Sequence, residues 1–206
     1  MRVYVFPLGN VVFYPSISKP LNVFEPRYVQ MVRDSIAQGV PIALAYVDDP
    51  DQEYVYQYGS PLSFVRPIAG YGHPLILEER PDGSLLVFLQ GRGKVRLGTA
   101  VDLKTPYIAC EAEPIVENHL MQNSNDVVQE FTTINKVLVK WLETHIPEPN
   151  NRDQFLRNIR SAEEVIGCFA SYLVADHDMQ QLLLESDDIN EKIHLVSGLI
   201  ASGEIV

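Results

Sequence analysis

The sequence predicts an α+β protein in which a β-rich domain, residues 1–117, precedes an all-helical domain, residues 118–206. Prolines, glycines and tyrosines concentrate in the first part, whereas helix-forming residues dominate the second. Ten basic and thirteen acidic residues give the first part a charge of −3, and six and fourteen give the second −8. Short apolar runs bounded by turn residues fill the first part, while apolar residues recur every three or four positions in the second.

Seven short strands are expected in the first domain, at residues 2–6, 21–24, 41–47, 62–66, 75–79, 85–90 and 107–115. The turn residues Pro81-Asp82-Gly83-Ser84 predict a hairpin between the fifth and the sixth of these strands. The run 85–89 is continuously apolar, which predicts a strand that is buried on both faces.

One helix is expected among these strands. Pro26 suits a first helical position, apolar residues then recur at helical spacing, and Gly39 ends the pattern. A helix inside a run of short antiparallel strands predicts a closed or half-closed barrel that the helix plugs.

The second domain is expected to form a helical bundle. An amphipathic stripe from Val127 to Trp141 predicts the first helix, and residues 146–151 end it. A capping box at 161–164 predicts the start of a central apolar helix, and two further helices follow at 179–185 and 189–202.

Composition limits the classes of partner. The 206 residues carry a net charge of −11, so nucleic acid and anionic membranes are poor partners. Cys110 and Cys168 lie far apart and are expected to be buried thiols. The start of the chain lacks the features of a signal peptide, and no apolar run is long enough to span a membrane, so a cytoplasmic location is expected.

No catalytic, metal-binding or cofactor-binding set is predicted, and no cofactor is expected. The segment Gly91-Arg92-Gly93-Lys94-Val95 superficially resembles a phosphate loop, but position 88 is phenylalanine and Val95 replaces the magnesium-binding hydroxyl. The five histidines are dispersed, and neither a nucleophile motif nor a paired-cysteine motif is present.

Two groups of residues are candidates for peptide binding. Aromatic and proline side chains gather near expected loops, with the first three tyrosines on one strand face: Tyr54, Tyr56, Tyr58, Tyr71 and Pro74. A basic stripe, Arg92, Lys94 and Arg96, alternates along one face of a strand. The competing interpretations are tyrosines that only pack against the sheet, and a charged edge that discourages aggregation.

The segments Phe6-Pro7-Leu8, Val12-Phe13-Tyr14-Pro15 and, above all, Pro20-Leu21-Asn22-Val23-Phe24-Glu25-Pro26-Arg27-Tyr28 resemble the N-terminal substrate-binding (LON) domain of Lon proteases. The resemblance implies a PUA-like β pseudobarrel followed by a helical bundle. In Lon proteases this domain recognises substrate proteins and helps to assemble the hexamer, and the ATPase and Ser–Lys peptidase follow it. This sequence has neither segment, so a stand-alone LON-domain protein is expected.

The matching residues Pro20, Phe24, Glu25, Pro26, Arg27 and Tyr28 are expected to be structural, because the chemistry of a helix start explains them without a ligand.

The resulting hypothesis is a non-catalytic module that binds unfolded or partly folded protein segments or peptides. A protease or chaperone as a second partner, and a weak homo-oligomer, stay open. The alternatives are an RNA-binding PUA-like protein, an accessory factor of an ATP-dependent protease, and an enzyme with an unrecognised site.

Overall fold

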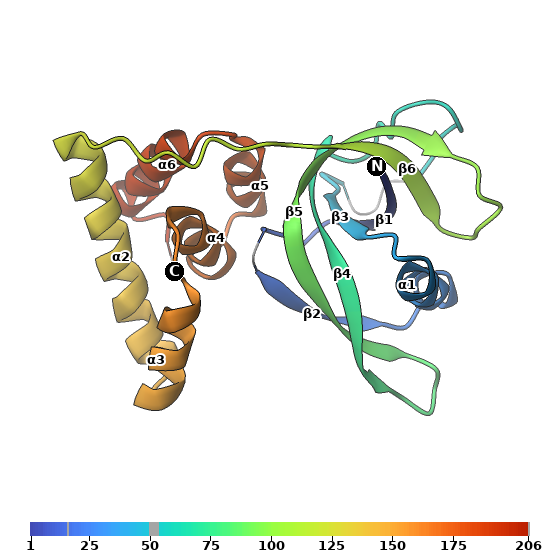
Figure 1. Cartoon of the computed structure of the whole chain (residues 1–206), viewed down its shortest axis with the longest axis horizontal. Coiled ribbons are helices and arrows are strands. Elements are labelled where there is room, and N and C mark those ends of the chain that lie inside the picture. Colours follow the sequence, from blue (N-terminus) through green and yellow to red (C-terminus); the bar gives the residue numbers. More distant parts are fainter. Residues whose placement is uncertain (16, 50–53, 206) are drawn as a thin grey trace. The chain divides into compact units, whose positions relative to one another are not determined.

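The computed structural model describes residues 1–15, 17–49 and 54–205 (Figure 1). Its backbone contacts divide the chain into two compact units, Met1–Ile115 and Val116–Val206. Unit 1 is a mixed sheet with one helix and unit 2 is helical, so the predicted α+β class is confirmed. The division into subdomains 1–117 and 118–206 stays a prediction.

The six strands of unit 1 form one mixed sheet that closes into a ring, which confirms the predicted pseudobarrel. They pair in the order β2-β5-β4-β3-β1-β6, and a further pairing of β5 with β6 closes five of them on themselves. Strands β1 and β3 pair in parallel, and the other pairs among these six strands are antiparallel. The bounds are β1 (Arg2–Leu8), β2 (Ser18–Val23), β3 (Ile42–Tyr46), β4 (Ile68–Glu79), β5 (Leu85–Val101) and β6 (Ile108–Pro114).

The long strand β5 closes the ring. Its 17 residues pair with β4 from Leu85 to Arg96 and with β6 from Val95 to Val101, while β2 pairs with its first six residues. A strand can serve three neighbours only if it bends, and register shifts interrupt its pairing with β4 at two places and with β6 at one. β4 and β5 therefore curve together around the unit (Figure 1).

Glycines permit the bend where the sequence resembled a phosphate loop. A Cβ on Gly72 would lie 2.1 Å from the carbonyl oxygen of Gln90 in β5. Gly70 instead makes room for the backbone of Phe13, whose carbonyl oxygen would lie 1.8 Å from an added Cβ. Arg92 is the extra residue of the bulge, because Tyr71 pairs with Gly93 and Gly72 with Gly91. The Gly91-Arg92-Gly93 segment is thus explained by strand curvature.

Two apolar clusters occupy opposite faces of the ring strands, as alternation along β1 shows. Val3 and Val5 belong to a core of mostly small residues from β1, β3, β4, β5 and β6, which loop residues 62–65 complete. Tyr4 and Phe6 point the other way, into a second core beneath α1 (Pro26–Gln38). We call these clusters the small-residue core and the helix-side core.

The helix α1 begins and ends as the sequence predicts. Pro26 occupies the first turn, where its missing N–H costs nothing. Gly39 adopts φ +68° at the C-cap, the left-handed conformation that glycine accepts most readily.

Three expectations about strands are wrong. Residues 62–66 form turns and bends, and Tyr54 to Tyr58 form irregular structure and a turn. These segments hold apolar side chains because they pack over the small-residue core. The resulting alternation of apolar and polar residues in the sequence is the same as that of a half-buried strand. Segment 85–89 is not buried on both faces, since Leu86 and Phe88 are only half-buried.

Unit 2 contains the predicted helices and one more. They are α2 (Asn125–His145), α3 (Pro149–Asn158), α4 (Ala162–Leu173), α5 (His177–Glu185) and α6 (Ile189–Ser202). The predicted capping box is present at Ser161 and Glu164. The sequence did not indicate α3, because that helix buries no residue and so lacks an apolar stripe.

A buried ion pair and a side-chain clip fasten the start of unit 2 to α6. Lys192 donates to Glu117, and both side chains are 7% exposed. Asn190 holds the same segment from two sides: its Oδ1 accepts from the Gln122 amide (2.8 Å), and its Nδ2 donates to the Leu120 carbonyl (3.0 Å).

We expect Gly72→Ala to lower the free energy of unfolding by about 1–3 kcal/mol, because the new methyl group overlaps backbone rather than a movable side chain. Gly198→Ala is the matched control. No atom lies within 4 Å of its added Cβ in α6, so it should raise stability by about 0.5–1 kcal/mol. Urea denaturation followed by circular dichroism measures both changes, and equal stability of the two variants would contradict the assigned strand contact.

Lys192→Met should destabilise unit 2 by about 3–5 kcal/mol, because the Glu117 carboxylate is left buried without its cation. The double variant Glu117→Leu, Lys192→Met should recover most of that loss, since no charge then stays buried. The single tryptophan, Trp141 in α2, reports the unfolding of this unit by fluorescence. A double variant as unstable as Lys192→Met would contradict this explanation.

Candidate functional site

A small pocket of about 80 Å³ in unit 1 is walled by aromatic rings. Three separate segments supply its walls: the start of α1, the irregular segment 54–58, and the entry to β6. We call it the aromatic pocket, and its lining residues are Arg27, Tyr28, Tyr54, Tyr56, Pro106, Tyr107 and Ile108.

The first turn of α1 places a cation beside one of these rings. Arg27 lies over the ring of Tyr28 at 4.6 Å from its centre, and its guanidinium contacts the Glu25 carboxylate at 2.8 Å. Tyr28 itself stacks on Phe6 of the helix-side core, with ring centres 4.2 Å apart. Arg27 is therefore oriented by two contacts while its side chain stays 45% exposed.

The second wall consists of tyrosines that rest on a buried ring. Tyr54 stacks on Phe64 with ring centres 4.7 Å apart and planes 14° apart. Tyr56 lies near the same phenylalanine and meets Tyr58 edge-on at 5.8 Å. The irregular backbone is thus anchored by ring contacts rather than by strand pairing.

The third wall is Tyr107, whose hydroxyl group donates to Asp34 of α1 at 2.7 Å. Its ring meets Tyr4 edge-on at 4.9 Å, and the Tyr4 hydroxyl in turn donates to Gln38 at 2.9 Å. These hydrogen bonds tie β1, α1 and the entry to β6 together, so this wall is fixed before any ligand binds.

Burial shifts the ionisation of several groups here. It raises the pKa of Tyr28 to about 12, an effect that the Arg27 guanidinium partly opposes. Burial, followed by the hydrogen bond to Asp34, raises the pKa of Tyr107 further.

The two cysteines lie outside the aromatic pocket. Burial raises the pKa of Cys110 to about 11 and that of Cys168 to about 12, so the two predicted buried thiols are confirmed and both stay protonated near neutral pH.

The predicted candidate residues fall into separate places. Tyr54 and Tyr56 line the aromatic pocket, and Tyr58 touches it through Tyr56. The Tyr71 ring covers Gly93, because a Cβ there would lie 3.0 Å from it. Pro74 pairs with a buried residue of β5, outside the pocket.

The basic stripe is interrupted. Arg92 and Arg96 are exposed, but Lys94 is 1% exposed, so the three predicted residues do not share one solvent-facing stripe. The bulge at Arg92 breaks its alternation with Lys94, whereas Lys94 and Arg96 pair with β4 in uninterrupted register and differ in burial. Arg96 lies directly opposite Glu113 of β6.

Sequence reasoning assigned Arg27 and Tyr28 to the fold alone and did not name Pro106, Tyr107 or Ile108. No periodic signal joins residues 27, 54 and 107, because pairing of β1 with both β3 and β6 is what brings their segments together.

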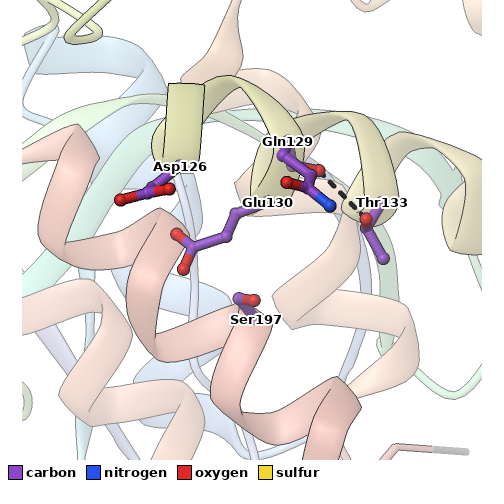
Figure 2. A pocket seen from close by; sticks show the side chains of 5 residues that line it. All are labelled: Asp126, Gln129, Glu130, Thr133 and Ser197. Atoms are coloured by element: carbon purple, nitrogen blue, oxygen red, sulfur yellow. Dashed lines mark hydrogen bonds between the residues drawn. The ribbon is translucent and has the colours of Figure 1, made fainter. Parts of the chain in front are cut away.

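Unit 2 contains a polar pocket of about 290 Å³ between α2 and α6. Figure 2 shows Glu130 reaching from α2 towards Ser197 of α6, next to Asp126. His194 contacts the Glu130 carboxylate at 2.6 Å, and the Thr133 hydroxyl donates to the Gln129 carbonyl at 3.0 Å. The lining is hydroxyl, amide and carboxylate, which does not suit an apolar ligand.

The part of the chain that the structure describes contains no cluster of three or more histidine, cysteine or acidic side chains placed to hold a metal ion. Among the same residues, no helix combines the length and the apolar character needed to cross a membrane.

Comparison with protein families gives a match to the ATP-dependent protease La (LON) substrate-binding domain over residues 2–202. The chain belongs to this family. The match confirms the resemblance seen in the Pro20–Tyr28 motif, and the family description is that of a substrate-binding domain.

Curated relatives of this LON domain are Lon proteases. The enzyme of Flavobacterium johnsoniae is 19% identical over 193 residues, which cover 91% of this chain and 22% of the relative. That of Buchnera aphidicola subsp. Acyrthosiphon pisum is 22% identical and is matched over 98% of this chain and 25% of its own length. The chain therefore spans about a quarter or less of these proteases.

Two solved structures share the fold of this LON domain. One is the Lon N-terminal domain protein from Xanthomonas campestris, with a TM-score of 0.66, 19% identity and 98% of each chain covered. The other is the N-terminal domain of the Mycobacterium avium complex Lon protease, with a TM-score of 0.69, 13% identity and the same coverage.

Within the LON motif, side chains have unequal environments. Tyr28 is 6% exposed and Val23 1%, whereas Phe24 is 73% exposed and belongs to neither core cluster. The structural role expected for this phenylalanine stays a prediction.

The stability of unit 1 should fall as the pH rises from about 10 towards 12. A tyrosine whose folded-state pKa is raised stabilises the fold below its unfolded pKa, near 10, and this contribution is lost as the pH rises through the folded value, which is about 12 for Tyr28. Urea midpoints measured every half pH unit from pH 8 to 12 should fall less steeply for Tyr28→Phe than for the wild type, because the variant has no hydroxyl group to ionise at this position. Parallel profiles above pH 10 would show that Tyr28 does not contribute.

Proposed function

We propose that this LON domain binds segments of unfolded or partly folded proteins, and that the aromatic pocket receives one apolar side chain of the segment. The observation that carries the proposal is the meeting of motif residues Arg27 and Tyr28 with Tyr54 and Tyr56 around one cavity. Tyrosine and arginine are enriched among the residues that dominate binding energy at protein interfaces.

The dimensions of the pocket support a single side chain as the inserted group. One water molecule needs roughly 10–15 Å³ of cavity volume. A cavity of about 80 Å³ therefore holds a small group of several heavy atoms rather than a folded element. Val55, 68% exposed, and Tyr58, 54% exposed, extend apolar surface from the second wall, over which flanking residues of the segment would lie.

The family supports a role in substrate handling rather than in catalysis. Because the matched family is a substrate-binding domain and the relatives are Lon proteases, we propose that the bound segments belong to proteins destined for an ATP-dependent protease. The chain would then act as an accessory factor that holds a substrate for such an enzyme.

Charge supports this function over the RNA-binding alternative. The chain carries −11, and its basic stripe retains two exposed members, Arg92 and Arg96, once the burial of Lys94 is considered. Each contact with an RNA phosphate would form against the electrostatic repulsion of the negatively charged protein.

Tyr56→Ala should weaken binding of unstructured peptides at least tenfold, because it removes one wall of the aromatic pocket. Tyr54→Trp is a second variant: it keeps the stack on Phe64 but narrows the cavity, so it should also weaken binding. Tyr172→Ala is the control, since it removes a 41%-exposed tyrosine from α4 of unit 2. Fluorescence anisotropy with a panel of labelled apolar peptides measures the dissociation constants.

Wild-type protein that binds no member of the panel would disprove peptide binding. Binding that is equally strong in Tyr56→Ala, Tyr54→Trp and the control would place the site elsewhere. A salt-dependent shift of labelled single-stranded RNA by the wild type, lost on Arg92→Ala, would favour the RNA-binding alternative instead.

A further inference from the structure

The strands β2, β5 and β4 present an apolar row on the face that points away from α1. Register places Pro20 of β2, Phe88 of β5 and Leu75 of β4 directly opposite one another. Leu86 follows in the next outward row of β5, and Leu77 is the extra residue of the bulge beside it. Leu75 is 50% exposed and Leu77 54%, while Leu86 and Phe88 are half-buried.

Phe24 extends the outward-facing side of β2 beyond the end of this strand. Leu21 and Val23 point into the helix-side core, whereas Pro20, Asn22 and Phe24 are exposed. The outward alternation therefore ends on a phenylalanine that is 73% exposed. We call the six apolar residues of this surface the open face: Pro20, Phe24, Leu75, Leu77, Leu86 and Phe88.

The opposite face of the same strands is covered by a helix. Leu85, Val87 and Leu89 of β5 lie in the helix-side core together with Met31 and Val32 of α1. The open-face residues belong to neither core cluster of unit 1. Asn22 and Glu78 flank Leu86 in its row, so the apolar surface is bordered by polar side chains. A group of exposed or half-buried side chains that includes two phenylalanines and three leucines is typical of a surface that binds a partner.

The dimensions of the open face fit one helix. Three strands span about 10 Å, which matches the diameter of a helix with its side chains at about 10–12 Å. From Pro20 to Phe24 the face extends about 13 Å, or roughly two and a half helical turns. The packing of α1 on the other face shows that these strands can receive a helix.

Arginines lie at both ends of the open face. At the hairpin end, Arg80 donates to Asn22 at 3.1 Å and lies 3.7 Å from the Glu78 carboxylate. At the bulge end, Arg92 is exposed, and no ion pair is formed by it within residues 1–15, 17–49 and 54–205. A complementary helix would carry carboxylates at the two ends of its apolar stripe.

We infer that the open face binds an amphipathic helix of a partner protein, whose apolar stripe is flanked by carboxylates. The inference shares no residue with the lining of the aromatic pocket and does not rest on the proposed function.

The test uses the full chain and a fluorescein-labelled 18-residue peptide with leucines in one helical stripe and glutamates in its first and last turns. Two control peptides have the same composition with the leucines permuted, or lysines in place of the glutamates. Anisotropy should show the striped acidic peptide binding at least tenfold more tightly than either control.

Leu75→Glu and Leu77→Glu should each weaken binding of the striped acidic peptide at least tenfold, because a carboxylate then replaces exposed apolar surface. Ile36→Glu is the matched control, because Ile36 is 49% exposed but lies on α1, on the other side of the sheet. This variant should bind the striped acidic peptide with the affinity of the wild type. Arg92→Glu should reverse the preference between the glutamate and lysine peptides. Tyr54→Trp should leave helix binding intact, which separates this surface from the aromatic pocket.

Equal binding of all three peptides, or full affinity in Leu75→Glu, would overturn the inference. Circular dichroism checks each fold, and Leu75→Gln replaces the glutamate variant if the latter unfolds. Sedimentation of the wild type and of Leu75→Glu tests the rival occupant, a second copy of this chain. A concentration-dependent dimer that Leu75→Glu abolishes, without binding of the striped peptide, would make the open face a contact between copies and the inference wrong.

Discussion

The backbone pairing of β5 is the constraint on which unit 1 depends. Buried N–H and C=O groups need partners, and this 17-residue strand finds them on β4 and β2 along one stretch and on β6 along another. It satisfies all three neighbours only because it bends at bulges. Gly72 of β4 permits the close approach at one of these bulges, since an added Cβ there would overlap the backbone of Gln90 in β5.

Closure of the ring also assembles the aromatic pocket. Val5 of β1 pairs with Ala43 on one side and with Ile108 on the other, so β3 and the entry to β6 flank the same strand. The chain that follows β3 carries Tyr54 and Tyr56, and the entry to β6 carries Tyr107. The sheet thus decides where these rings meet, while stacking on Phe64 and the hydrogen bond to Asp34 decide how they are oriented.

The same curvature gives the two faces of β2, β4 and β5 different roles. One face is filled by α1 and the helix-side core, and it supplies stability. The other retains the exposed apolar side chains of Phe24, Leu75 and Leu77, which add nothing to the cores of unit 1. The LON motif spans both roles: Tyr28 is buried and lines the aromatic pocket, whereas Phe24, four residues earlier, is exposed to solvent.

Caps and apolar periodicity are local signals, so the sequence was enough to predict the fold class, helix α1 with its Pro26 start and Gly39 end, and four of the helices of unit 2. It also determined the family, through the run from Pro20 to Tyr28. The folded structure was needed to show that Lys94 is buried, that residues 62–66 are turns, and that Arg27, Tyr54 and Tyr107 line one cavity. The physical reason is that the burial of a side chain depends on what packs against it, and that non-local strand pairing joins segments with no shared pattern.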